Sequence, residues 1–404
     1  MSSPRRNSPP NRRPAHGSEV DSDADRAAAR EPVAAKLFPP ETGGSTGVPE
    51  AITDDRTPVR VTKVAIADAT KRAASLAVTL QRELDLDVVG IASAPRQVER
   101  LLDRHKVNVL VVDAENPALL PLVASSCQAG IATLAVVFSP AGGPSAAAAV
   151  HALQAGALDV VPIGASRRGP PDEFFAGELI DKIRVATRAK LSGRRLSTPP
   201  PRHVSPAASH DSTERVIVVG ASTGGTEAIR TLIGDLPPTA PPVVVVQHMP
   251  AGFTRTFAEH LDQSVEVAVR HAADGDPLRR GEVLVAPGDT HLRVVRQGQV
   301  ARVRTADGPK VSGHRPSIDV LMSSAAEAFG ARAIGVVLTG MGRDGADGLL
   351  ALRQAGARTF AQDEATSVVF GMPRAAYEND GAESLVPLEE LAARILGAVA
   401  RNAA

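Results

Sequence analysis

Between Arg60 and Leu191 the chain alternates short apolar runs with stretches of helical periodicity. Five runs have the Val and Ile content of buried strands: V-T-K-V-A-I-A (61–67), D-V-V-G-I-A (87–92), V-N-V-L-V-V-D (107–113), T-L-A-V-V-F-S (133–139) and L-D-V-V-P-I (158–163). Such runs, each followed by a helix, are typical of a parallel sheet with both faces covered. The last helix is predicted from Glu173 to Leu191. Residues 58–191 are therefore predicted to form a flavodoxin-like (βα)5 domain.

A second pattern begins at Arg215 and differs from the first in the glycine-rich turns at its strand ends. Its long apolar runs are R-V-I-V-V-G (215–220), P-V-V-V-V-Q-H-M-P (242–250) and A-I-G-V-V-L-T-G-M-G (333–342), with a shorter one near Thr359. Helical spacing follows the first run at Ile229, Leu232, Ile233 and Leu236, and further helices are predicted from about Leu349 and Leu388. Alternation between Glu282 and Val303 predicts an antiparallel hairpin. Residues 215–404 are thus predicted to form a doubly wound, mostly parallel α/β domain with an antiparallel edge hairpin.

Two segments lack an apolar pattern of either kind. Residues 1–57 are rich in Arg, Pro, Ser and Ala and show neither a two-residue nor a 3.6-residue period. Residues 192–214 contain three consecutive prolines among small polar residues. These compositions predict a disordered tail and a linker between the two domains.

Composition and charge narrow the functional classes. The chain has 404 residues, with 45 Lys and Arg against 45 Asp and Glu. A net charge of zero lacks the basic footprint of proteins that bind phosphate backbones, so no nucleic-acid partner is predicted. Cys127 is the single cysteine, which excludes an internal disulfide or a cysteine zinc cluster. No apolar run reaches the roughly 18 residues of a membrane helix. We therefore predict a cytoplasmic protein without direct membrane insertion.

The first candidate for chemistry is Ser222, in the turn G-A-S-T-G-G between a predicted strand and a predicted helix. Gly220, Ser222 and Gly224 fit the G-x-S-x-G pattern of a nucleophile on a tight turn. The same turn also fits a phosphate or dinucleotide cradle built from helix amides, and a plain helix cap whose serine has no chemical role. The turn by itself leaves these three interpretations open.

The neighbouring strand ends shift the balance between them. A dinucleotide fold has an acidic residue at the end of its second strand, but here that strand ends in Gln247 and His248. A P-loop would need a lysine that G-G-T-E lacks. The third long strand ends in T-G-M-G-R-D-G-A-D-G, which contains Asp344. Because the carboxyl ends of parallel strands share one crevice, Ser222, His248 and Asp344 are expected there as nucleophile, base and orienting acid.

Structural interpretations of the same residues stay open at this point. A lone histidine is often structural, and an aspartate in a glycine-rich turn is often only a turn former. Asp347 and Asp363 are rival carboxylates that spacing does not exclude. The chain order Ser, His, Asp disfavours an α/β-hydrolase, which places its acid before its histidine.

Six segments carry a family resemblance: V-V-G-A-S-T-G-G-T-E-A-I-R, V-V-V-Q-H-M-P-A-G-F-T, V-A-P-G-D-T-H, H-R-P-S-I-D-V-L, V-L-T-G-M-G-R-D-G-A-D-G-L and Q-D-E-A-T-S-V-V-F-G-M-P-R-A-A. In this order they resemble the protein-glutamate methylesterases of bacterial chemotaxis, the CheB family, over nearly all of residues 215–400. The resemblance implies that Ser222 is the nucleophile, His248 the general base and Asp344 its orienting acid. It also implies that the Met341 amide helps to form the oxyanion hole and that Thr223 supports the site.

The resemblance further implies the reaction and the partner. The substrate would be a glutamate methyl ester on the cytoplasmic helical bundle of a methyl-accepting chemoreceptor. Its hydrolysis would release methanol and would need no cofactor. Family members often also deamidate receptor glutamines, which leaves glutaminase as a second activity for this chain.

The family places a receiver domain before the esterase, and the five βα units resemble one. Asp113 stands at the phosphoacceptor position and Ser139 at the switch position. However, Ala67 and Asp68 stand where two adjacent carboxylates usually hold Mg²⁺, and the residues at 162–163 are Pro and Ile where threonine and lysine would stand. Without the lysine, charge on a phosphoryl group loses a direct neutraliser. We therefore predict a degenerate receiver with inefficient phosphorylation; in the alternative interpretation, Asp113 is only a polar residue that ends a strand.

Two other functions stay open on the sequence. The first is a non-catalytic regulatory module that binds a histidine kinase through its receiver-like half. The second is an esterase that acts on another methylated or acylated protein outside chemotaxis. His314, Arg315 and Asp363 are further candidates for shaping the crevice, or else structural hydrogen-bonding groups.

Overall fold

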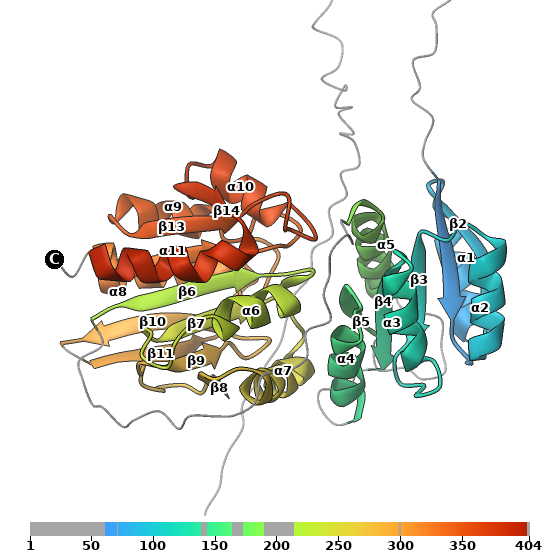
Figure 1. Cartoon of the computed structure of the whole chain (residues 1–404), viewed down its shortest axis with the longest axis horizontal. Coiled ribbons are helices and arrows are strands. Elements are labelled where there is room, and N and C mark those ends of the chain that lie inside the picture. Colours follow the sequence, from blue (N-terminus) through green and yellow to red (C-terminus); the bar gives the residue numbers. More distant parts are fainter. Residues whose placement is uncertain are drawn as a thin grey trace, which may run out of the picture. The chain divides into compact units, whose positions relative to one another are not determined.

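A computed structural model describes most of the chain from residue 61 onward (Figure 1). The described residues are 61–70, 72–138, 144–163, 173–189, 214–298 and 300–401. The predicted tail, nearly all of the predicted linker, the predicted helix end at Leu191, and Ser139 lie outside them. The described residues belong to one compact unit.

Residues 61–189, here called the N-terminal domain, form one parallel sheet in the order β2-β1-β3-β4-β5. Its strands are β1 (Thr62–Ala67), β2 (Leu86–Ala92), β3 (Val109–Asp113), β4 (Ala132–Phe138) and β5 (Asp159–Ile163). Its helices are α1 (Arg72–Leu80), α2 (Pro95–Arg104), α3 (Leu120–Gln128), α4 (Pro144–Gln154) and α5 (Glu173–Arg188). A helix follows every strand, which confirms the predicted (βα)5 fold.

The N-terminal sheet has a hydrophobic core on each face. Successive side chains of a strand point to opposite faces. Along β3, Val109 and Val111 accordingly belong to one core cluster, whereas Leu110 and Val112 belong to the other. Burial on both faces explains why these strands are continuous Val and Leu runs rather than alternating ones.

Residues 214–401, here called the C-terminal domain, contain a seven-stranded sheet in the order β14-β13-β12-β6-β7-β9-β8. All its strand pairs are parallel. The strands are β6 (Val216–Ala221), β7 (Val243–Gln247), β8 (Ala268–His271), β9 (Glu282–Val285), β12 (Ala333–Val337), β13 (Arg358–Gln362) and β14 (Ser384–Val386).

Helices cover both faces of the C-terminal sheet. The helices are α6 (Gly225–Gly234), α7 (Ala251–Ser264), α8 (Ile318–Phe329), η2 (Gly330–Arg332), α9 (Ala346–Gln354), α10 (Met372–Glu378) and α11 (Leu388–Arg401). Helices α6, α7 and α11 pack on one face, where they are seen in front of the sheet in Figure 1. Helices α8, α9 and α10 pack on the other face. The arrangement confirms the predicted α/β class. No helix among the described ranges combines the length and the apolar character needed to cross a membrane.

The antiparallel hairpin is present, but it is a sheet of its own. It consists of β10 (His291–Gln297) and β11 (Val300–Ala306), which pair only with each other among the described strands. The start of the predicted hairpin, Glu282–Val285, is instead a parallel strand of the main sheet. The burial pattern gives the reason: β9 is buried at every position, whereas β10 and β11 alternate buried and exposed residues, as a hairpin with one solvated face does.

The strand order places the candidate residues at one edge. Strand β6 lies between β12 and β7, so the carboxyl ends of these three strands are adjacent. The chain that leaves β6 contains Ser222, the chain that leaves β7 contains His248, and the chain that leaves β12 contains Asp344. Helix α9 begins at Ala346, three residues before the predicted start, so Asp344 lies directly in front of a helix.

Candidate active site

Ser222 is the first residue after β6 and precedes the turn that opens α6. Its amide donates to the Thr339 carbonyl at 3.0 Å. Its carbonyl accepts hydrogen bonds from Gln247 Nε2 at 2.9 Å and from the Gly225 amide at 2.7 Å. The backbone of the serine is therefore fixed by the loops that follow all three central strands, and the predicted tight strand-to-helix turn is present.

Two glycines make room for this turn. Gly224 has a φ of +76°, and a Cβ there would lie 2.7 Å from Val368 Cβ. A Cβ on Gly340 would lie 2.7 Å from Ser222 Cβ and 2.3 Å from Met372 Sδ. The nucleophile candidate thus packs directly against the backbone of the loop after β12.

His248 is the first residue after the neighbouring strand β7. Its amide donates to the Ala221 carbonyl at 3.0 Å, and its side chain is only 7% exposed. Ring atom Nε2 lies 2.8 Å from Asp344 Oδ2. Ring atom Nδ1 is buried and has no hydrogen-bond partner among the described residues. Because an ionised carboxylate only accepts, the proton of a neutral His248 belongs on Nε2, which leaves the lone pair on Nδ1.

Asp344 is bound by four donors. Oδ1 accepts from Ser317 Oγ at 2.8 Å and from the Asp319 amide at 3.0 Å, and Oδ2 accepts from the Ile318 amide at 2.8 Å as well as from His248. Three of these groups form the amino terminus of α8, where free amides favour an anion. Burial alone raises the pKa of this carboxyl, but the His248 hydrogen bond and charge and the two amides outweigh it and lower the pKa to about 2.

The two rival carboxylates have other partners. Asp347 is exposed on α9, where it pairs with Arg343 at 3.0 Å and accepts from Asn379 Nδ2. Asp363 accepts from the amide and the hydroxyl of Thr366 and so closes its own turn. Of the three acidic residues considered from the sequence, Asp344 is the one that the structure brings to His248.

Three residues around this pair received no role from the motif spacing. His314 stacks on His248, with ring centroids 3.6 Å apart and planes 9° apart. Ser317 caps α8 and binds Asp344. Asp319 accepts from the amides of Gly345 and Gly348 and so binds the start of α9. The sequence identified His314 as a candidate for shaping the crevice, whereas the segment H-R-P-S-I-D carried the resemblance but gave no role to Ser317 or Asp319.

The loop after β12 contains Met341, which follows the glycine that packs against Ser222. Met341 is 44% exposed, and its amide donates to no acceptor among the described residues. The loop is held on one side by Thr339 Oγ1, which donates to the Thr223 carbonyl at 3.0 Å. On the other side, the Gly340 amide donates to the Val369 carbonyl. A rigid loop with a free amide is the arrangement that an oxyanion hole needs.

Thr223 lies next to the serine but bonds to the N-terminal domain. Its hydroxyl donates to Asp159 Oδ2 at 2.8 Å, and Lys182 Nζ lies 3.1 Å from Asp159 Oδ1. The Gly224 amide donates to the Leu158 carbonyl at 3.2 Å. The beginning of β5 therefore contacts the turn that contains Ser222.

These contacts narrow the space at the serine. One pocket is lined by Ser222, Gln247 and His248 together with Leu158 and Asp159 of the N-terminal domain. Its cavity volume is about 10 Å³. That volume is about what a single water molecule requires. A methylated glutamate side chain is much larger than a water molecule.

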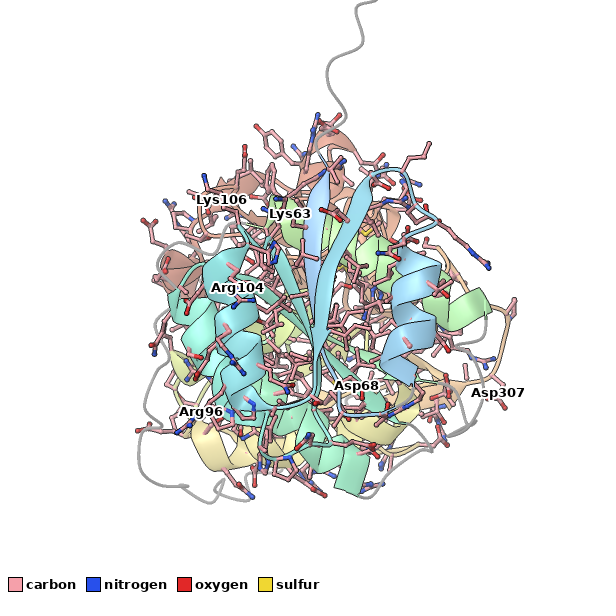
Figure 2. All side chains as sticks on the ribbon, turned by 90° about the vertical axis from the view of Figure 1, so that its right-hand side faces the viewer. Lys63, Asp68, Arg96, Arg104, Lys106 and Asp307 are labelled. Atoms are coloured by element: carbon pink, nitrogen blue, oxygen red, sulfur yellow. The ribbon has the colours of Figure 1, made fainter. Side chains whose placement is uncertain are left out.

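The N-terminal domain has a smaller acidic site. Asp113 ends β3, and Asp68 lies just beyond the carboxyl end of β1 (Figure 2). Both are buried, at 7% and 9% exposure. Burial, with a contribution from the negative charge of Asp68, raises the pKa of Asp113 to about 6, although the nearby Arg72 opposes this.

The acidic site has one carboxylate fewer than the receiver resemblance implies. Asp68 and Asp113 offer two, a number that Mg²⁺ often uses, but Ala67 stands where the third would be. Ala67 is buried and apolar, and Pro162 lies on β5. The nearest lysine of α5, Lys182, is bound to Asp159 and Glu178 instead. No group of three or more His, Cys, Asp or Glu in the described ranges is arranged to hold a metal ion.

Comparison with known proteins places this geometry in context. The family model described as CheB methylesterase matches residues 217–395. A protein-glutamate methylesterase/protein-glutamine glutaminase of Syntrophotalea carbinolica is 41% identical over 363 residues, which cover 84% of this chain and 98% of that protein. A protein-glutamate methylesterase/protein-glutamine glutaminase 3 of Burkholderia lata is 42% identical over 330 residues, which cover 78% of this chain and 89% of that protein.

Two solved structures are also similar. The crystal structure of the Thermotoga maritima CheB methylesterase catalytic domain is 37% identical, covers 45% of this chain and 97% of that chain, and has a TM-score of 0.44. The response regulator domain of Thermotoga maritima CheB is 27% identical, covers 32% of this chain and 99% of that chain, and has a TM-score of 0.27.

Proposed function

The chain belongs to the CheB methylesterase family, and on this premise we propose that it hydrolyses glutamate methyl esters on the cytoplasmic domain of chemoreceptors. It is a carboxylic ester hydrolase, a protein-glutamate methylesterase. The observation that carries the proposal is the 2.8 Å bond between His248 Nε2 and Asp344, which leaves the buried Nδ1 with a lone pair, in a residue that lines one pocket together with Ser222.

The first half of the reaction is acyl transfer to the serine. His248 Nδ1 takes the proton of the Ser222 hydroxyl while the oxygen attacks the ester carbonyl of the glutamate side chain. The carbonyl oxygen becomes an oxyanion, and in this proposal the Met341 amide donates to it. When the intermediate collapses, the carbon–oxygen bond to the methoxy group breaks and that group leaves as methanol with the proton from His248.

The second half regenerates the enzyme. A water molecule gives a proton to His248 and attacks the glutamyl ester, and Ser222 leaves with that proton. Asp344 stays ionised throughout and stabilises the imidazolium that forms twice in each cycle. Nucleophile, base and anion are all side chains of this chain, so we propose that hydrolysis uses no cofactor.

A glutamine side chain fits the same sequence of steps. The attacked carbonyl then carries an amide, and the leaving group is ammonia, which takes its proton from His248. The relatives at 41% and 42% identity are named for both activities. We propose glutaminase as the second activity of the site, and the cytoplasm as its place of action because the receptor domain lies there.

We propose that the N-terminal domain restricts the site. The support is the contact between Thr223 and Asp159, and the cavity of about 10 Å³ that is left at Ser222. This volume is about that of one water molecule, so we propose that the two domains move apart for turnover. The incomplete acidic set around Asp113 further supports a receiver that is phosphorylated inefficiently, so a protein partner is the proposed source of the opening.

The test is methanol release from a methylated receptor fragment by the full-length chain. Ser222→Ala should lower the rate by ~10⁴ to 10⁶-fold. The matched control is Ser264→Ala, which removes a buried hydroxyl whose one hydrogen bond among the described residues is to the Leu261 carbonyl in its own helix. This control should keep the wild-type rate. Wild-type turnover by Ser222→Ala would refute the assignment.

A serine-reactive phosphonate separates the alternatives. Labelling of the wild type and not of Ser222→Ala supports an active hydrolase, whereas no labelling in either points to a non-catalytic module. Labelling without methanol release from purified receptors would contradict the chemoreceptor substrate and favour another methylated or acylated protein.

A further inference from the structure

A second imidazole lies flat against the proposed base. The His314 ring stacks on the His248 ring with centroids 3.6 Å apart and planes only 9° apart. His314 comes from a tight turn, in which the backbone of Val311 and His314 exchanges two hydrogen bonds. The two central residues, Ser312 and Gly313, have φ values of +51° and +82°, as in a type I′ turn. The stacked ring is thus held by a rigid backbone.

This turn and the loop around Asp344 are tied to the same carboxylate. Asp319 Oδ2 accepts from Ser312 Oγ at 2.8 Å. Asp319 Oδ1 accepts from the Gly345 amide at 2.9 Å, directly after Asp344. The position of the stacked ring relative to the acid is therefore fixed through one side chain. Nothing in the acyl-transfer steps described above uses His314.

We propose that His314 is a positioning residue that holds the His248 ring in the plane in which Nε2 bonds to Asp344 and Nδ1 is left to accept the proton of Ser222. The inference rests on the proposed function of the site. Its physical basis is that a single hydrogen bond to Asp344 fixes one ring atom but permits the ring to tilt about that bond. A second flat ring in van der Waals contact removes the tilt, and stacking attracts the two rings.

The charge state of His314 suits this role. The groups that act on it are His248, Lys310 and Lys182, which are basic, and Asp344, which is acidic. Burial, followed by the His248 charge, lowers the pKa of His314 to about 4. At neutral pH His314 is an uncharged aromatic face, which attracts the imidazolium formed at His248 during the reaction. A charged His314 would repel it.

The test uses full-length His314→Ala, His314→Phe and, as a matched control in the same turn, Val311→Ala. For methanol release we expect His314→Ala to lower kcat about tenfold, the effect of one aromatic stack, with KM almost unchanged. Phe restores a flat ring and should recover most of kcat, and Val311→Ala should behave as wild type. Thermal midpoints of all variants report whether a loss reflects unfolding.

The pH profile gives a readout that a merely structural residue would not move. In the wild type, His314 begins to charge below about pH 5, given its pKa of about 4. The positive charge on His314 should lower kcat below about pH 5, and the pH profile of His314→Phe should lack this decrease. Equal losses in the Ala and Phe variants, or an Ala variant with wild-type kcat and pH profile, would overturn the proposal.

A measurement without turnover separates this inference from the proposed function. In ¹⁵N NMR, His248 of the wild type and of His314→Phe should show one dominant tautomer, protonated on Nε2. In folded His314→Ala the signal should shift toward a mixture of both tautomers. An unchanged Nε2 tautomer in His314→Ala would overturn the positioning role even if no methanol release were found for any variant.

Discussion

Replacing Asp344 by asparagine tests the central electrostatic argument with the smallest change of shape. The carboxylate accepts two hydrogen bonds at each oxygen: Ser317 Oγ and the Asp319 amide at Oδ1, and the Ile318 amide and His248 Nε2 at Oδ2. An asparagine side chain has one accepting oxygen and one donating nitrogen. One of the two backbone amides must therefore face an NH2 group.

The orientation of the new asparagine amide decides which nitrogen of His248 holds the proton and whether a negative charge lies beside the ring. If its nitrogen takes the place of Oδ2, it can donate to His248 Nε2, and the proton of a neutral ring moves to Nδ1. Nδ1 can then no longer take the proton of Ser222. If its nitrogen takes the place of Oδ1, the imidazolium loses the negative charge beside it. Both orientations should lower kcat, and we expect a loss of ~10⁴-fold, which corresponds to about 5 kcal/mol.

The same change should lower stability. A buried amide that faces another donor costs about 1–3 kcal/mol. The wild-type carboxyl also contributes through its pKa, which falls from 3.8 to about 2 on folding. Because this pKa is depressed, the contribution is present above pH 4 and is lost as the pH falls through about 2. Its size is on the order of 2 kcal/mol.

Two assays check these numbers. Methanol release at neutral pH measures the loss of kcat, and urea unfolding between pH 2 and pH 7 measures the free energy of unfolding. Asp344→Asn should be less stable than the wild type at pH 7, and the difference should shrink toward pH 2. The matched control is Asp347→Asn, which changes an exposed carboxylate in the first turn of α9, three residues after Asp344. An Asp344→Asn enzyme with near wild-type kcat would refute the argument.

Three further predictions use other parts of the structure. Gly340→Ala should place a Cβ 2.3 Å from Met372 Sδ and 2.7 Å from Ser222 Cβ. We expect ~10²-fold lower activity and about 1–3 kcal/mol lower stability. Unchanged kinetics would contradict the packing argument. Asp159→Ala removes a hydrogen bond of about 1 kcal/mol to Thr223, the residue next to Ser222, so basal methanol release should rise about fivefold. A fall in methanol release would contradict the proposal that the N-terminal domain restricts the site. Incubation with acetyl phosphate and Mg²⁺ should leave Asp113 largely unmodified by intact-mass spectrometry, and stoichiometric phosphorylation would refute the degenerate receiver.

The fold was predictable because strands that are buried on both faces appear in the sequence as continuous apolar runs. The run at 107–113 and the run at 215–220 each became a central strand of a parallel sheet. Helix starts were less accurate, since α9 begins at Ala346 rather than near Leu349. The reason is local: Gly345 has a φ of +95° and lets the chain enter the helix immediately after the loop.

The hairpin prediction shows a limit of periodicity. Alternation was expected from Glu282 onward, but E-V-L-V is buried on both faces and pairs within the main sheet. A four-residue strand is too short for a period of two to be distinguished from a continuous run. The antiparallel hairpin, residues 291–306, alternates buried and exposed positions over a longer stretch, so its strands are easier to predict from the sequence.

The sequence identified candidate site residues at the strand ends, but it could not predict the contacts between loops that are far apart in the chain. The sequence placed Ser222 and His248 at neighbouring strand ends, and the structure does so. Spacing could not choose between Asp344 and its rivals, because the choice depends on the amino terminus of α8, which arrives from a different part of the chain. The same holds for the stacking of His314 on His248.

Two buried carboxylates at this site have opposite environments. Asp344 has four donors, and its pKa is lowered to about 2. For Asp319, burial and the charge of Asp344 outweigh its hydrogen bonds and raise the pKa. Neighbouring acids whose pKa values are driven apart have different roles. Asp344 therefore keeps a permanent negative charge beside His248, as the proposed mechanism requires, and Asp319 binds the backbone of the loop that contains Asp344. Because the pKa of Asp344 is about 2, this carboxylate stays ionised between pH 5 and pH 7, so its protonation would not account for a loss of activity in that range.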